Sequence, residues 1–167
     1  MKRRSLSLAA LLLVSGCGGW ALDQPTATAT LPPDVVQGAG DPLRAAVMQS
    51  SYVFANPRRF VGRPDDVARA VANQEYLTVA ILSDPRLNVF NGNIPVLLAD
   101  GRTEARTFYG IAPGATPQAV IDSLYSYARA LRLGDRAAAE RALSPAIFPN
   151  PAETMARLAQ APALPLS

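Results

Sequence analysis

The sequence contains no histidine, and Cys17 is its only cysteine. A Ser-His-Asp triad, a Cys-His dyad and an imidazole or thiolate zinc site all need residues that are missing here. A disulfide framework needs a second cysteine. Glycine-rich phosphate loops and nucleophile elbows are also absent from the sequence. Any chemistry therefore depends on carboxylates, tyrosine, serine, threonine or arginine, and we expect no cofactor and no metal ion.

An excess of charge is also missing once the N-terminus is set aside. The whole chain has a formal charge of +3 and a pI of about 9.4. Lys2, Arg3 and Arg4 lie at its start, and the remaining chain has 13 basic and 13 acidic residues. Binding to nucleic-acid phosphates needs a surface with excess positive charge. The composition therefore argues against a nucleic-acid partner.

The first residues have the layout of a secretory signal. A basic stretch (residues 2–4) is followed by an apolar run (residues 6–14) and then by two small residues. The apolar run is much shorter than the ~20 residues that a membrane-spanning helix needs. We therefore expect residues 1–16 to be a signal peptide that is removed by cleavage before Cys17.

The sequence Val14-Ser15-Gly16-Cys17 resembles the lipobox of bacterial lipoproteins, in which one aliphatic and two small residues precede a lipidated cysteine. The resemblance implies a diacylglycerol thioether on the Cys17 sulfur and an acylated amino group, which together would anchor the chain firmly in the membrane. Gly18 stands where the family's inner-membrane retention signal is aspartate. This difference favours the outer membrane, facing the periplasm, over the inner membrane. The resemblance covers about the first tenth of the chain and implies nothing about activity.

The segment that follows the cysteine has the composition of a linker. Residues 18–40 contain three prolines, an alternating Thr-Ala stretch and no sustained apolar period. Such a composition cannot bury enough apolar surface to fold. We therefore expect residues 17–40 to be the lipidated cysteine and a flexible tether with a reach of roughly 25 Å.

Residues 41–167 have the helix start and stop signals of a single helical domain. A capping residue followed by proline favours a helix start, because the cap side chain accepts a free N–H and proline has none to leave unpaired. Gly134 suits the left-handed end of a helix. We expect an all-α fold, a small bundle of five to six helices with proline-marked turns. The helices begin or end near Asp41-Pro42, Asn56-Pro57, Pro64, Asp84-Pro85, Thr116-Pro117, Asp135 and Asn150-Pro151.

The segment 94–111 is open to two interpretations. Its apolar residues have helical spacing, which favours a third helix. The pair Asp100-Gly101 also suits the turn of a hairpin between strands 96–99 and 103–109. We favour the helix. The preceding residues 87–93 are expected to form a turn-rich loop.

Glu75 is the carboxylate with the strongest case for a catalytic role. It lies seven residues after Ala68, three after Ala72 and four before Val79, so the helix that carries it would turn it partly inward. Burial favours the neutral form of a carboxyl group, which can then act as a general acid or base. The alternative, which is much commoner, is an ion pair with an arginine or a surface position.

Other acidic residues make weaker candidates. Asp100 and Glu104 lie four apart and could share a helix face, but calcium needs six or more oxygen ligands. We expect both to be solvated. Asp65 and Asp66 suit the first turn of a helix, where the helix dipole favours negative charge. We therefore expect no metal ligand among them.

Two further features suggest contacts with a ligand or partner. Arg58, Arg59 and Arg63 form a basic loop that could hold a phosphate or carboxylate, although such loops are usually just solvated. Tyr125 and Tyr127 lie two apart on one predicted helix, so they should not face the same way. We therefore expect at least one of them at the surface or in a groove.

Three functions remain compatible with the sequence. The first is a non-enzymatic lipoprotein of the cell envelope that binds another envelope protein or the cell wall. The second is a module that binds a lipid or small molecule in an apolar groove between the helices that begin at Pro64 and Pro117. The third is a carboxylate-dependent envelope enzyme, which needs Glu75 or Asp100 in a cleft. We favour the first and expect no catalytic residue, because the usual catalytic residues are missing.

Overall fold

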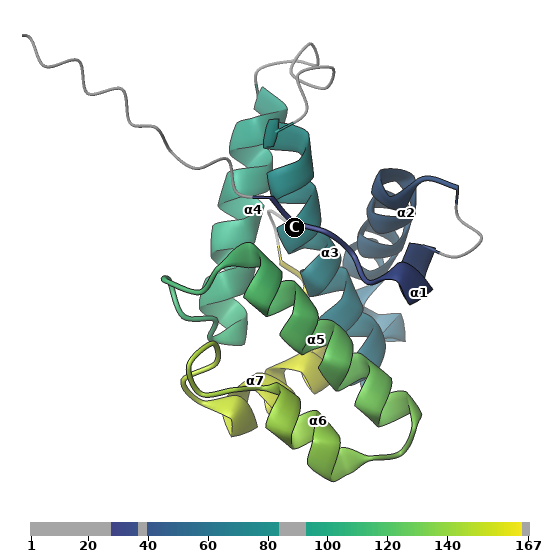
Figure 1. Cartoon of the computed structure of the whole chain (residues 1–167), viewed down its shortest axis with the longest axis vertical. Helices are drawn as coiled ribbons and strands as arrows, with labels where there is room; N and C mark the ends of the chain where they lie inside the picture. Colours follow the sequence, from purple (N-terminus) through teal and green to yellow (C-terminus); the bar gives the residue numbers. More distant parts are fainter. Residues whose placement is uncertain (1–27, 37–39, 84–92, 165–167) are drawn as a thin grey trace, which may run out of the picture.

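The computed structural model describes residues 28–36, 40–83 and 93–164, and every regular element within them is helical (Figure 1). The predicted all-α fold is thereby confirmed. The predicted signal peptide, Cys17 and residues 84–92 lie outside the described residues. The elements are α1 (Pro33–Val36), α2 (Pro42–Ala55), the 3-10 turn η1 (Pro57–Arg59), α3 (Pro64–Ser83), α4 (Asn93–Tyr109), α5 (Pro117–Arg132), α6 (Arg136–Ala142) and α7 (Pro151–Gln160).

The predicted capping residues begin their helices as expected. The Asp41 carboxylate accepts the backbone N–H of Leu43 at 2.9 Å, and the Asp135 carboxylate accepts that of Ala138 at 2.8 Å. Thr116 and Asn150 cap α5 and α7 in the same way. These bonds satisfy N–H groups that have no partner inside the helix. Gly134 has a φ of +74° after the end of α5, which confirms the predicted left-handed position.

Helix α3 is central to the fold. It packs against α2, α4, α5 and α7, and Figure 1 shows it running between α2 and α4 with α5 across its lower half. With 20 residues it is the longest described helix. Ala68, Ala70 and Ala72 are buried along it, and their small side chains allow neighbouring helices to approach closely.

Helix α4 settles the choice between a helix and a hairpin for this segment. Gly101 lies inside the helix and is buried, with Ala105 and Tyr109 one and two turns later on the same face. This face contacts α3 and α7. The Asp100-Gly101 pair therefore does not form a turn, because the glycine gives the helix a flat surface for close packing.

The helical spacing of residues 42–55 predicts a core face of Leu43, Ala46, Val47, Ser50 and Phe54, and the structure departs from this face at Val47. The sequence placed Val47 in the core stripe, but its side chain is exposed. Val53 is buried instead, together with Ala46 and Ser50. Val47 instead lines an open groove between α2, α3 and α4.

The tether predicted for residues 17–40 includes residues 28–36, which the structure describes as packed on the helical domain. Leu31 is buried against the core, and α1 follows it. The Gln118 side chain on α5 accepts the backbone N–H of Thr30 at 2.8 Å and donates to its carbonyl at 3.2 Å. One apolar side chain and one paired peptide group hold a segment whose composition alone predicts coil.

Candidate functional site

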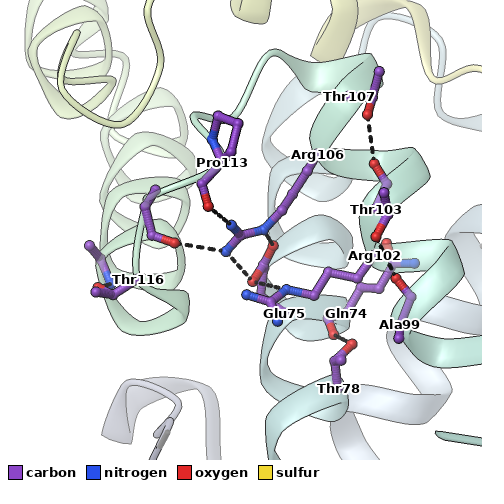
Figure 2. Close-up of polar contacts among 12 residues, drawn as sticks. Gln74, Glu75, Thr78, Ala99, Arg102, Thr103, Arg106, Thr107, Pro113 and Thr116 are labelled. Carbon is purple, nitrogen blue, oxygen red and sulfur yellow. Dashed lines mark hydrogen bonds and ion pairs between the residues drawn. The ribbon is translucent and has the colours of Figure 1, made fainter. Parts of the chain in front are cut away.

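The buried carboxylate of Glu75 lies between two arginines of the neighbouring helix. Glu75 comes from α3 and is 2% exposed, whereas Arg102 and Arg106 come from α4 and are 24% and 13% exposed. Residues four apart on a helix share a face, so both guanidinium groups reach the same carboxylate (Figure 2). The burial predicted for Glu75 is confirmed, and so is the alternative of an ion pair with arginine.

The geometry of this pairing is that of a strong, charge-assisted contact. Arg106 donates from Nε to Glu75 Oε1 at 2.6 Å and from Nη2 to Oε2 at 2.9 Å. Arg102 donates from Nε to the same Oε2 at 2.8 Å. Two parallel bonds from one guanidinium fix the orientation of both groups. Both carboxylate oxygens are thus occupied by arginine, which leaves Glu75 poorly placed to take a proton from a substrate.

Arg106 also ties down the segment between α4 and α5. Its Nη2 donates to the carbonyl of Ala115 at 3.0 Å, and its Nη1 lies 3.4 Å from the carbonyl of Pro113 (Figure 2). These carbonyls follow α4 and precede the cap of α5. The cluster of Glu75, Arg102 and Arg106 therefore connects three segments and has the form of a structural brace.

A groove of about 600 Å³ runs along α4 beside this brace. Arg102 and Arg106 line it together with Thr103 and Thr107. Both threonine hydroxyls donate to backbone carbonyls one turn earlier, at 2.8 and 2.9 Å. The threonines therefore offer the groove acceptors rather than donors, and the two arginines are already directed toward Glu75.

The remaining acidic candidates do not come together. Asp100 is exposed and Glu104 is half-buried on α4. The described residues contain no group of three or more histidine, cysteine, aspartate or glutamate side chains placed to hold a metal ion. Asp65 and Asp66 lie in the first turn of α3, as predicted, and pair with arginines.

The basic loop predicted from Arg58, Arg59 and Arg63 is partly used within the protein. Arg63 contacts Asp66 at 2.5 Å, and its guanidinium lies over the Phe60 ring at 5.0 Å. Arg59 donates to the Tyr52 hydroxyl at 3.2 Å. These contacts orient two of the three arginines along the protein surface, so the loop does not form a converging anion site.

Neither Tyr125 nor Tyr127 is exposed at the surface, and of the two Tyr127 meets the expectation of a surface or groove position, because it lines a hollow. The Tyr125 hydroxyl donates to Asn73 Oδ1 at 2.6 Å inside the protein. Tyr127 is buried at the wall of a hollow between α5, α6, α7 and the start of α3. Burial raises the pKa of each tyrosine to about 12. Helix α5 is covered by α3 on one side and by α6 on another, so two differently oriented side chains can both be buried.

An apolar groove was expected between α3 and α5, and the hollow of about 480 Å³ that Tyr127 lines touches both helices, at Pro64 and at Leu131, but lies mainly against α6 and α7. These two helices are in close contact, and the small hollow that they share is lined by three arginines, Arg69, Arg129 and Arg132. A second apolar groove, of about 430 Å³, lies between α2, α3 and α4. Its signal was present in the sequence as apolar residues on 42–55 and 94–98, but helix periodicity assigned those residues to the core.

Known proteins offer no direct parallel. Comparison with protein-family models, curated proteins and solved structures finds no match. The function must therefore be argued from the geometry of this chain. None of the described helices has the length and hydropathy to cross a membrane.

Proposed function

We propose that this protein is a lipid-anchored lipoprotein of the bacterial cell envelope, without catalytic activity, whose helical domain binds a partner protein in the apolar groove between α2, α3 and α4. The observation that carries the proposal is the apolar lining of that groove together with the exposed apolar side chains at its rim. Acylated Cys17 would hold the protein at the membrane, with the outer membrane favoured.

The residues that line the groove are mostly apolar. None of its described lining residues is charged. The hydroxyls of Ser50 and Ser51 point back to the carbonyls of Ala46 and Val47 at 2.7 and 2.6 Å. A ligand in the groove would therefore meet little unsatisfied polar surface, which favours an apolar occupant.

The rim extends this apolar surface beyond the groove. Val47 on α2 and Ile94 on α4 line the groove and are exposed, and the neighbouring Met48 and Leu97 are exposed as well. Large exposed apolar patches on a soluble domain usually mark an interaction surface. Two helices with apolar rims suit an amphipathic helix of a partner protein, whose anchors recur every three or four residues. A single acyl chain would cover the floor of the groove and leave the rims exposed, so a protein partner fits better.

The position of the anchor relative to the domain supports a contact close to the membrane. Residues 28–36 lie against α5 and the core, so only residues 18–27 separate Cys17 from the folded domain. The proposed partner would therefore be another protein at the same membrane. The separation is shorter than the tether of residues 17–40 predicted from the sequence.

In-cell crosslinking of the lipidated protein tests the groove. A photoreactive residue at Leu97 should capture one recurrent protein, and Val47→Asp should abolish that capture because it places a charge at the groove wall. Leu133→Asp is the matched control, since Leu133 is an exposed apolar residue after α5 and away from the groove. Circular dichroism would verify that both variants fold. Capture that survives Val47→Asp, or recovery of lipid alone, would refute the protein-binding proposal.

Fatty-acid labelling tests the anchor separately. The wild-type chain should incorporate labelled palmitate in cells, and Cys17→Ser should not, because Cys17 supplies the only thiol. Membrane fractionation should then move the Cys17→Ser protein out of the membrane pellet. An unlabelled wild-type protein would exclude the lipoprotein assignment and leave the groove proposal to stand alone.

A further inference from the structure

A second cluster of arginines lies between α3 and α5, apart from the brace at Glu75, which joins α3 to α4. Arg69 on α3 and Arg129 and Arg132 on α5 line a hollow of about 120 Å³, which we call the arginine hollow. Arg129 and Arg132 are three apart on α5, so they lie on one face of that helix. One water molecule takes up roughly 30 Å³ of liquid, so the volume suits a group about the size of phosphate.

The arginine hollow already holds one carboxylate of the same chain. Asp34 of α1 lines it, and both of its oxygens lie 2.9 Å from Nη2 of Arg129. Asp34 and Arg129 are 95 positions apart in the sequence. The carboxylate therefore reaches the hollow because residues 28–36 pack along α5, and not through any local helix contact.

The other two arginines are less completely paired. The Nε of Arg69 is buried and has no hydrogen-bond partner within the described residues. The nearest carboxylate oxygen to Arg69, on Asp66, lies 3.8 Å from Nη1, beyond normal hydrogen-bond length. Arg132 contacts Asp65 at 3.2 Å through Nε. Arg69 therefore has no close carboxylate among the described residues, and an oxyanion in the hollow that it lines would supply the missing counter-charge.

Asp34 is the part of this network that can be replaced most easily. Its side chain is 57% exposed, and α1 has only four residues. A helix of that length has little stability of its own, because forming the first turn fixes the backbone of several residues and gains only one hydrogen bond. An anion with two negative charges would attract three arginines more strongly than one carboxylate does.

We infer that Arg69, Arg129 and Arg132 form a phosphate-binding site, which Asp34 occupies in the absence of phosphate. The site accepts a phosphate group, either as the free ion or on the headgroup of a phospholipid. Binding displaces Asp34 and releases α1 from α5. The site lies apart from the α2–α3–α4 groove, so it does not depend on the proposed function.

The first test is calorimetric titration of inorganic phosphate into the full chain. Asp34→Asn removes the internal competitor and should bind phosphate about fivefold more tightly than the wild type, the gain that a pair of about 1 kcal/mol allows. Asp100→Asn is the matched control, because it makes the same charge change at an exposed position on α4. Equal phosphate affinity in Asp34→Asn and Asp100→Asn would overturn the proposal.

A second variant separates a binding site from a general charge effect. Arg132→Gln, made in the Asp34→Asn background, should weaken the affinity for phosphate at least tenfold. Arg136→Gln in the same background should leave that affinity unchanged. Arg136 is exposed on α6 and does not line the arginine hollow. Equal losses from the two arginine variants would also overturn the proposal.

Vesicles distinguish the two sources of phosphate. The Asp34→Asn protein is mixed with phosphatidylcholine vesicles that contain one-fifth phosphatidic acid, and binding is measured by co-sedimentation. Binding that Arg132→Gln abolishes would support a lipid headgroup as the ligand. Binding of inorganic phosphate without vesicle binding would support the free ion.

Discussion

The substitution Glu75→Gln tests whether the carboxylate between α3 and α4 is a structural brace. Glutamine keeps the shape of the side chain and removes its charge. Arg102 and Arg106 would then face a neutral amide, although both donate to Glu75 at 2.6–2.9 Å in the folded protein. The substitution therefore leaves two guanidinium charges next to the core without their counter-ion.

The size of the effect follows from the burial of the three groups. Removing one partner of a buried ion pair costs about 3–5 kcal/mol. Arg102 and Arg106 keep 24% and 13% of their side-chain exposure, so water can solvate part of the released charge. We therefore expect the low end, about 3 kcal/mol of lost stability. For a domain of this size that corresponds to a fall in Tm of roughly 10 °C.

Urea and thermal unfolding, followed by circular dichroism, provide the measurement. The urea midpoint should fall at an unchanged slope, since the surface exposed on unfolding stays the same. Glu140→Gln is the control, because Glu140 pairs with Arg136 at 3.6 Å on the exposed surface of α6, and such pairs contribute less than about 1 kcal/mol. A loss below about 1 kcal/mol for Glu75→Gln would refute the brace, as would an equal loss in the control.

Further stability predictions concern a glycine, a buried hydroxyl and two tyrosines. Gly134→Ala should cost about 1 kcal/mol of stability, because φ at this position is +74°; a new Cβ would contact nothing, so the cost comes from the backbone alone. Gly134→Asn should cost less, and equal losses for the two variants would contradict left-handed strain. Thr154→Val should cost about 1 kcal/mol in urea unfolding, since it removes the bond to the Tyr109 carbonyl at 2.8 Å; an unchanged midpoint would show that this bond is unimportant. Burial raises the pKa of Tyr125 and Tyr127 to about 12 from 10, so the unfolded chain loses these protons first. Their contribution to stability is therefore complete below about pH 10 and falls toward pH 12. Unfolding at pH 8 and pH 11 should show this fall, Tyr127→Phe should reduce it, and identical wild-type curves at the two pH values would contradict it.

Local features of the fold were predictable because their causes are local. A helix start depends on a cap and its next few residues, and Asp41, Thr116, Asp135 and Asn150 all cap as expected. The burial of Glu75 followed from alanine and valine positions within two turns of the same helix. In each case the residues that decide the structure are neighbours in the sequence.

Features that depend on distant contacts were predicted less well. The partners of Glu75 lie 27 and 31 positions later, and only the four-residue spacing of Arg102 and Arg106 hinted at a shared face. Tyr125 and Tyr127 are both buried because α5 is covered on two sides, which a single helical stripe cannot indicate. The docking of residues 28–36 depends on Gln118 and Arg129, both far along the chain.

The two arginine clusters differ in the element that supplies the counter-ion, and this difference predicts opposite consequences. Glu75 belongs to the longest described helix and is 2% exposed, so removing its charge costs stability. Asp34 belongs to a four-residue helix and is 57% exposed, and an exposed pair of this kind contributes at most about 1 kcal/mol. Asp34→Asn should therefore unfold at nearly the wild-type urea midpoint while Glu75→Gln does not. A large loss of stability in Asp34→Asn would show that α1 is a fixed part of the core, and would remove the basis for its displacement by phosphate.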